Sequence, residues 1–286
     1  MKLFKVVAGV GISVFLLAGS PYALAQTVIS PGPEVKTKDG MEKWQIGLSA
    51  TYMSGNYGTD VRTNTLYVPL SIRRLFQDGD ITLIIPYVRI TSNGSVTFVN
   101  GVPVRIQTTG ATTTRTTHEG LGDIILQGRY YILNEREYLP ATAVIAHVKF
   151  PTADDSKGLG TGDWDEGIGL ELSKRFGENW VGFLDGGYSV IGNPEKVVGR
   201  PAGVPLKNQW WNYDIGLGYY LTRALLASVF YEEWRTLVPG TVNPRDILFS
   251  LMYKATQTVR FNVAFEKGIS NDAPDYGITG GVSFRF

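Results

Sequence analysis

Ten ionisable residues stand inside segments in which apolar and polar residues alternate. They are Asp123, Arg129, His147, Glu171, Arg175, Asp185, Asp214, Glu233, Arg260 and Glu266. Because alternate side chains of a β-strand point to opposite faces, each of them lies opposite a row of apolar neighbours. A basic residue that faced lipid would cost roughly 2–4 kcal/mol near the bilayer midplane, so we expect the ten to face a lumen. There they either brace the wall through salt bridges or line a pore. Since both signs of charge occur, no strong ion selectivity is predicted.

The two histidines, His118 and His147, are the candidates for catalysis. Known lipid hydrolases built on membrane β-barrels carry a His-x-Ser sequence on a strand, where the imidazole activates the serine. The residue two places after His118 is Gly120, and the residue two places after His147 is Lys149. Because neither is a serine, we expect no catalytic residue and no enzyme activity.

A loop rich in carboxylates is the one candidate for a metal site. Its acidic residues are Asp154, Asp155, Asp163, Asp165 and Glu166. Their spacing does not match the calcium loop of an EF-hand. The glycines at 158, 160 and 162 do not form a dinucleotide motif, because that motif needs a strand that leads into a helix. We therefore expect a solvated loop, with no metal and no cofactor.

The elements that must position these residues are short segments of alternating character. The last one, Tyr276–Phe286, places its apolar residues on one face and carries aromatic residues at both ends, as a strand that crosses a bilayer does. Other rows run over 44–52, 66–72, 83–87, 124–132, 144–150, 168–172, 180–190, 211–219, 226–234, 247–253 and 259–265. In the least regular row we assign Leu226, Phe230 and Trp234 to the apolar outer face. The pattern predicts an all-β fold, an antiparallel transmembrane β-barrel of about twelve strands.

The connections between the segments alternate in length. Short ones include Gln77–Gly79, Gly177–Asn179 and Thr222–Arg223, whereas Thr91–Thr117 and Gly192–Gln209 are long. Bacterial outer-membrane barrels have short periplasmic turns and longer extracellular loops. We therefore expect the short connections to face the periplasm and the loop Thr91–Thr117 to face outside.

The beginning of the chain indicates export. Lys2 and Lys5 precede an apolar run, and Ala23-Leu-Ala25 provides a small-x-small cleavage pattern, so residues 1–25 are predicted to be a signal peptide. Residues 26–43 are polar and aperiodic, and we interpret them as a tail or a loose plug before a barrel that spans 44–286. There is no cysteine, so the fold cannot depend on disulfides. The net charge of +1 gives no electrostatic basis for binding nucleic acid.

Two stretches resemble a known family. Gly120-Leu-Gly-Asp-Ile-Ile-Leu-Gln-Gly-Arg-Tyr-Tyr131 resembles the Gly-Leu-Gly-Asp strand of outer-membrane transporters associated with the MetA pathway of phenol degradation. Val148-Lys-Phe-Pro-Thr-Ala-Asp154 and Gly158-Leu-Gly-Thr-Gly-Asp163 are similar to that family's Lys-x-Pro-Thr-Gly-Asp and Leu-Gly-Thr-Gly sequences, with Ala153 in place of the usual glycine. The resemblance implies an outer-membrane channel associated with aromatic or hydrophobic compounds.

Pro69 and Pro86 each lie inside a predicted strand, where a proline removes a hydrogen-bond donor from the ladder. Both are equally far from the turn near Gln77, so they are predicted to face each other across the hairpin. The same register pairs Leu70 with Ile85. The missing donors either form a shared bulge that shapes the wall or open a lateral gap through which a hydrophobic solute leaves the lumen.

The sequence as a whole predicts a protein of the bacterial outer membrane that admits small, hydrophobic or aromatic molecules passively. Two other functions remain open: a lipid hydrolase carried by the barrel, and a structural or adhesion barrel that acts through its extracellular loops. The expected partners are outer-membrane lipids, a small-molecule solute and the barrel assembly machinery. The last of these would recognise the terminal strand Tyr276–Phe286.

Overall fold

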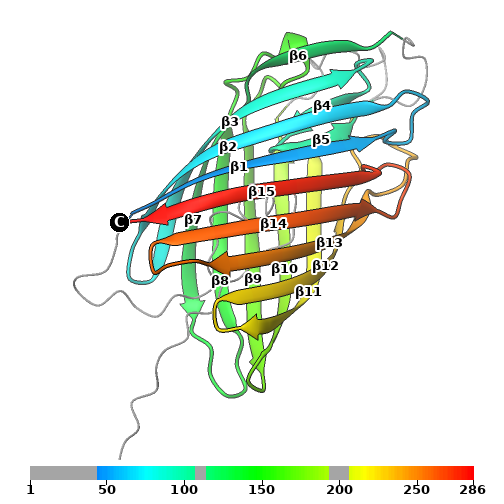
Figure 1. Cartoon of the computed structure of the whole chain (residues 1–286). Helices are drawn as coiled ribbons and strands as arrows, with labels where there is room; N and C mark the ends of the chain where they lie inside the picture. Colours follow the sequence, from blue (N-terminus) through cyan, green and yellow to red (C-terminus); the bar gives the residue numbers. More distant parts are fainter. Residues whose placement is uncertain (1–43, 107–113, 193–205) are drawn as a thin grey trace, which may run out of the picture.

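The computed structural model describes residues 44–106, 114–192 and 206–286 (Figure 1). The predicted signal peptide, residues 1–25, and the segment 26–43 lie outside the described residues. Among the described residues, no helix is long and apolar enough to cross a membrane.

Twelve antiparallel strands form a closed barrel, as predicted. They are β1 (Trp44–Gly55), β2 (Thr63–Leu75), β3 (Gly79–Ser92), β7 (Ile124–Leu133), β8 (Ala141–Phe150), β9 (Asp165–Phe176), β10 (Trp180–Ile191), β11 (Gln209–Thr222), β12 (Leu225–Trp234), β13 (Arg245–Lys254), β14 (Val259–Gly268) and β15 (Tyr276–Arg285). The barrel closes because β15 pairs with β1. Closure leaves no edge strand with unpaired backbone groups, which a bilayer interior would not tolerate.

Three further strands and one short helix belong to the connections. β4 (Val96–Val99) and β5 (Val102–Arg105) form a hairpin that pairs with no wall strand, whereas β6 (Thr116–Leu121) pairs with β3. β6 continues directly towards β7, and both pair with β3, so the two form one wall position that is interrupted at residues 122 and 123. The helix η1 (Asp155–Lys157) lies between β8 and β9.

The wall separates apolar and polar residues as the alternation predicts. Ile168 on the outer face of β9 is 64% exposed, whereas Glu171 on the inner face is 4% exposed. Trp44, Leu48 and Phe284 are likewise exposed on the outer face. The barrel therefore presents an apolar band to its surroundings and keeps its charged residues inside.

The short turns and the long connections lie at opposite ends of the barrel, because the strands run alternately up and down and the short connections are every second one. The start of β1 lies at the short-turn end beside the end of β15. There the amide of Trp44 donates to the carbonyl of Phe286 at 2.9 Å, and the amide of Phe286 donates back at 3.0 Å.

Strand β12 corrects one sequence-based assignment. Leu226, Phe230 and Trp234 are at most 2% exposed and face the lumen, not the surroundings. Both faces of this strand carry apolar residues, so alternation alone did not separate them. The pairing of β11 with β12 also shifts register between Tyr220 and Thr222.

The predicted pairing of the prolines is confirmed: Pro69 faces Pro86, and Leu70 faces Ile85. The β2–β3 ladder runs through this level without a break. The breaks lie on the outer sides of the two strands instead. The β1–β2 ladder skips Pro69, and β3 changes its partner from β7 to β6 across Pro86. This follows from antiparallel geometry. The backbone nitrogens of Pro69 and Pro86 point away from the β2–β3 ladder, so the missing N–H donors are lost from the ladders on the outer sides of the two strands.

Candidate functional site

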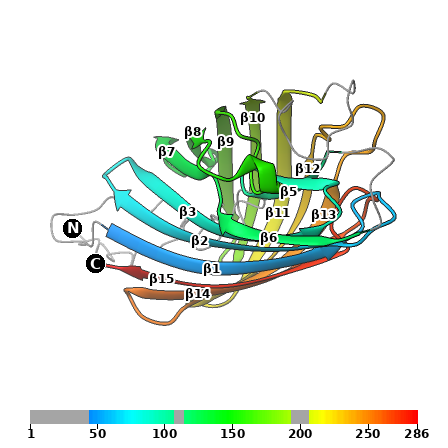
Figure 2. The ribbon, with the colours of Figure 1, turned by 90° about the horizontal axis from the view of Figure 1, so that it is seen from above.

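The β4–β5 hairpin lies inside the barrel, within the curve of the wall strands (Figure 2). All eight of its residues are buried. Val99, Val102 and Val104 belong to one apolar cluster with inward residues of the wall, among them Ile84 and Trp210. The β4–β5 part of the loop Thr91–Thr117 therefore folds into the lumen, whereas residues 114–117 are exposed.

Polar contacts of Thr97 and Arg105 hold the hairpin in place. Thr97 donates from its Oγ1 to the carbonyl of Gly158 at 3.0 Å. Arg105 forms an ion pair of 3.1 Å with Asp272, which lies in the connection between β14 and β15. Burial raises the pKa of the Asp272 carboxyl, and the Arg105 guanidinium acts in the opposite direction. The hairpin is thus attached to both sides of the barrel.

Several residues of the stretches that carry the family resemblance meet in one buried cluster, together with Asp165. Lys149 Nζ lies 3.1 Å from a carboxylate oxygen of Asp123 and 3.1 Å from one of Asp165, and it also donates to Thr161. The amide of Ala153 donates to Asp123 at 3.1 Å. This cluster, which we call the lysine node, ties the interruption between β6 and β7 to the connection between β8 and β9.

The lysine node changes the interpretation of the acidic loop. Leu159 and Thr161 are at most 1% exposed, so this loop packs into the barrel and is not solvated throughout. Only its outer part is open to solvent, where Lys157 pairs with Asp154 at 2.8 Å. Among the described residues, no group of three or more His, Cys, Asp or Glu side chains is placed to hold a metal ion.

A chain of ion pairs braces one side of the lumen. Arg73 pairs with Asp80. Arg129 lies 3.5 Å from Asp80 and donates to Glu171 at 2.8 Å. These contacts link β2, β3, β7 and β9. They match the bracing role that was one of the two alternatives for the interior charges.

A second set of interior charges is acidic only. Across β9 to β13 the register aligns Glu171, Asp185, Asp214, Glu232 and Asp246 as successive cross-strand neighbours. We call these five residues the carboxylate row. Like charges that face each other across strands are destabilising, so the row is not an ordinary way to build a wall.

Most of the sequence-predicted site residues are buried on the inner face. These are Asp123, Arg129, His147, Glu171, Asp185, Asp214, Arg260 and Glu266. Arg175 has the inward parity but lies exposed at the short-turn end, where its Nε pairs with Glu135 at 3.0 Å. The structure therefore brings together the lysine node, the ion-pair chain and the carboxylate row, and it leaves Arg175 at the rim.

The prediction that Glu233 faces the lumen is corrected by its hydrogen bonds. Glu233 accepts hydrogen bonds of 2.9 Å from the hydroxyls of Tyr213 and Tyr231, whose rows face outwards, and it accepts one of 2.7 Å from Asn243. The error has the same cause as the inverted assignment of β12. Glu232 occupies the inward position and is 1% exposed.

The sequence analysis also missed several charged residues of the lumen wall besides Glu232. Among them are Arg73, Asp80, Lys149, Asp165 and Asp246. The sequence contains a signal for each of them, because each has the inward parity, opposite to the apolar row of its strand. They lie near strand ends, however, where parity alone does not separate a lumen residue from a rim residue.

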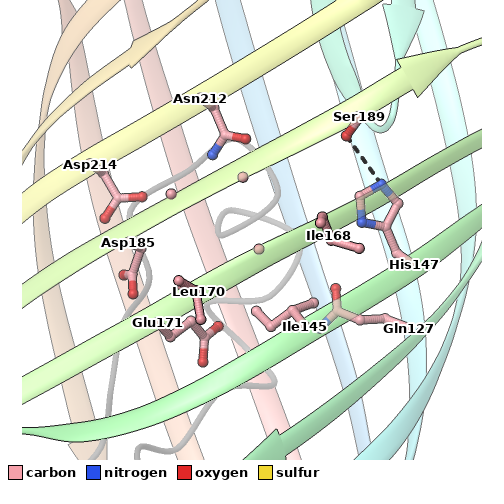
Figure 3. Close-up of a pocket in the computed structure, with 13 residues that line it drawn as sticks. Gln127, Ile145, His147, Ile168, Leu170, Glu171, Asp185, Ser189, Asn212 and Asp214 are labelled. Carbon is pink, nitrogen blue, oxygen red and sulfur yellow. Dashed lines mark hydrogen bonds between the residues drawn. The ribbon is translucent and has the colours of Figure 1, made fainter.

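His147 lies beside a small cavity of about 50 Å³, whose wall includes Gln127, Asp185 and Asn212 (Figure 3). His147 Nε2 is 3.4 Å from Ser189 Oγ, although the two residues come from β8 and β10. They meet over β9 because residue 167 is a glycine, where a Cβ would lie 2.1 Å from the imidazole. A cavity of this size holds water molecules.

Comparison with known proteins gives a family and a fold. No curated protein matches the sequence. The outer membrane channel COG4313 from Pseudomonas putida F1 is similar in structure, with a TM-score of 0.71 and 10% identity over 90% of this chain and 100% of the other. The toluene transporter TodX of P. putida gives a TM-score of 0.48 and 13% identity, with coverage of 94% and 93%. At these identities the likeness to COG4313 shows the fold alone.

A match between the sequence and a family model shows the family. A family model described as "Putative MetA-pathway of phenol degradation" matches residues 77–286, which include the lysine node and the carboxylate row. The match covers most of the chain, and it contains both stretches on which the resemblance rested. The protein is thus a member of the MetA-pathway phenol-degradation family, built as an outer-membrane β-barrel.

Proposed function

We propose that the protein is an outer-membrane channel for the passive uptake of small molecules, and that hydrophobic or aromatic compounds are its solutes. One observation carries the proposal. The interior of an outer-membrane barrel is ordinarily polar, whereas this lumen contains large apolar side chains. Phe183 and Phe230 meet inside the wall with ring centroids 5.3 Å apart, and Trp210 packs against the hairpin cluster.

Two comparisons support this proposal. The family description refers to phenol degradation, which is the breakdown of an aromatic compound. The structure that is similar at a TM-score of 0.71 is an outer membrane channel. An aromatic ring transferred from water to an apolar lumen gains free energy in proportion to the apolar area it buries, so the inner clusters would favour such solutes.

The hairpin must move or deform for a solute to pass. Its buried apolar residues occupy the lumen, and its polar attachments include the Arg105–Asp272 ion pair and the hydrogen bonds of Thr97. We therefore propose that the hairpin controls passage. The prolines provide the second part of the proposed route, because β3 changes its partner from β7 to β6 across Pro86, where the amide of Gly122 is bonded to the Pro86 carbonyl at 2.8 Å. A hydrophobic solute would leave sideways there.

The other two functions have less support. Ser189 and His147 face the lumen and come from different strands, so the pair is not the membrane-side arrangement of a barrel lipid hydrolase. The β4–β5 hairpin is buried, so it offers no surface for adhesion.

Liposomes that contain the folded barrel test the channel proposal. Swelling in an iso-osmotic solution of a small sugar should exceed that of empty liposomes, and uptake of a labelled aromatic compound should be faster in cells that produce the barrel. Folding is checked by electrophoresis, since a closed barrel stays compact in cold detergent and unfolds on boiling. A folded barrel that changes neither swelling nor uptake would contradict the proposal.

A further inference from the structure

An arginine lies on the outer face of the wall, close to the short-turn end. Arg74 is the cross-strand partner of Trp44, which is exposed on that face, whereas the adjacent Arg73 is buried in the lumen. The Arg74 guanidinium lies 4.9 Å from the centre of the Trp44 ring and 5.9 Å from that of the Phe76 ring. Arg74 forms no ion pair with a described residue. Its charge is therefore directed towards the surroundings of the barrel.

The level of Arg74 in the wall is that of the membrane interface. Aromatic residues gather where barrel strands meet the interface, and Trp44 and Phe76 stand on either side of the guanidinium. A lipid-facing arginine is costly at the midplane but tolerated near the interface. Both rings attract the cation, and a guanidinium matches the geometry of a phosphate group. Arg74 is thus placed to meet the phosphate of a lipid.

An open groove of about 530 Å³ lies beside Arg74 on the same outer face. Its large apolar residues are Phe76, Ile81, Tyr130 and Val144, each at least 37% exposed. Phe76 joins the groove to the arginine, because it lines the groove and also contacts the guanidinium. The groove belongs to the apolar band of the wall, so a hydrocarbon chain suits it.

Small residues create the groove. The register aligns Arg74, Ile81, Gly128 and Ala146 as successive neighbours on β2, β3, β7 and β8. The last two have little or no side chain, so the outer surface is recessed there. A Cβ added to Gly128 would meet no atom within 4 Å. Atoms that border an unfilled space lose their dispersion contacts, so an acyl chain that enters the recess gains them.

The charges at the groove indicate the kind of head group. Asp78 lines the groove from the turn between β2 and β3, and Arg74 lies beside it. A head group that carries both a phosphate and an ammonium complements this pair of charges. A head group with a net negative charge fits less well, because it also meets the carboxylate.

We propose that this groove binds a glycerophospholipid of the periplasmic leaflet, with its phosphate against Arg74 and one acyl chain in the recess over Gly128 and Ala146. The leaflet follows from the short turns, which are expected to face the periplasm. The site lies on the outside of the wall, so it does not rest on the proposed function of the lumen.

Native mass spectrometry of the purified barrel in a neutral detergent tests the site. The probe is dioleoylphosphatidylethanolamine, and dioleoylglycerol is its phosphate-free analogue. We expect a saturable phospholipid adduct and weaker binding of the analogue. Arg74→Gln should weaken phospholipid binding by about tenfold, because a charge-assisted hydrogen bond is lost, and it should leave binding of the analogue unchanged. Gly128→Leu fills the recess and should weaken binding of both lipids.

Two changes elsewhere on the outer face are matched controls. Arg89→Gln removes an exposed arginine that pairs with Glu119 at the end with the long connections. Gly280→Leu adds the same side chain on β15, at a glycine where an added Cβ would also meet no atom within 4 Å. Both should bind the two lipids like the wild type. Each variant is first shown to be folded by its mobility in cold detergent. If Gly128→Leu does not fold, Arg74→Gln and the two lipids still decide.

Any of three results would overturn the proposal: no saturable adduct on the wild-type barrel, equal binding of the two lipids, or an equal loss in a variant and its control. An equal loss of both lipids in Arg74→Gln would also overturn it, since the arginine would then act without the phosphate. A dimer that disappears in Gly128→Leu, with no lipid adduct, would assign the groove to a second copy of the chain. No solute is present in these measurements, so failure of the channel proposal would leave their outcomes unchanged.

Discussion

At the scale of single residues, the lysine node shows how one charge can organise a wall. Lys149 is fully buried between Asp123 and Asp165, and it connects an interrupted strand to a folded loop. A buried charge that lies between two opposite charges is difficult to replace, because its removal leaves both partners uncompensated.

We therefore expect Lys149→Met to destabilise the barrel by about 3–5 kcal/mol, the range observed when one partner of a buried pair is removed. The measurement is the temperature at which the compact gel band disappears. Lys157→Met is the control, since Lys157 forms an exposed pair with Asp154 and its loss should change little. Equal effects of the two changes would contradict the structural role of the lysine node.

Removing the charge of Glu232 and removing that of Glu233 should change the stability of the barrel in opposite directions. Glu232→Gln removes a like charge beside Asp214 and Asp246, so it should stabilise the barrel by roughly 0.2–1 kcal/mol. Glu233→Gln weakens the charged acceptor of two tyrosine hydroxyls and should destabilise it by about 1 kcal/mol. The same unfolding temperature reports both. If Glu233→Gln stabilised the barrel and Glu232→Gln did not, Glu233 would be the residue that faces the lumen.

At the scale of elements, the hairpin is attached to the connection between β14 and β15 by the Arg105–Asp272 ion pair, so the effect of its release can be measured. Arg105→Ala removes the ion pair with Asp272, so the hairpin should leave the lumen more often. We expect a higher mean conductance in planar bilayers. Arg62→Ala is the matched control, because Arg62 pairs with Asp275 at the exposed rim. An unchanged conductance in the first variant would show that the ion pair does not retain the hairpin.

The two prolines separate the proposed lateral route from simple shaping of the wall. Pro86→Thr restores a donor at the place where β3 changes partners, whereas Pro69→Thr restores one on the β1 side. If solutes leave at Pro86, uptake of a labelled aromatic compound should fall in the first variant and in the double variant, but not in Pro69→Thr. Wild-type uptake by a folded double variant would show that the prolines only shape the wall.

The elements also show what alternation can and cannot predict. The rows on β1 and β15 were assigned correctly, because each has one apolar and one polar face. β12 was inverted, since its sequence Leu-Leu-Ala-Ser-Val-Phe-Tyr-Glu-Glu-Trp carries apolar residues on both faces. The inward position of the β4–β5 hairpin was not predictable, because its valines suit a wall strand equally well. Contacts such as Arg129–Glu171 depend on the register of several strands, which periodicity does not fix.

At the scale of the whole molecule, the lengths of the connections predict its orientation. An epitope inserted at Gly240, in a long connection, should be reached by antibody on intact cells. The same epitope in the turn Gly177–Asn179 should be reached only after the cells are lysed, because short turns face the periplasm. Accessibility of the second epitope on intact cells would show that the barrel has the reverse orientation, provided that both proteins are folded.

The pairing of β1 with β15 also constrains how the molecule can be made. Every other pair of wall neighbours follows one another along the wall, so those strands can pair locally, but Trp44 can bond to Phe286 only when the two ends of the chain meet. Contacts between distant parts of a chain form slowly. During that interval both terminal strands expose unpaired edges, which are templates for aggregation. The closed barrel has no free strand edge. Until its two terminal strands pair, however, the barrel depends on protection of those edges against aggregation.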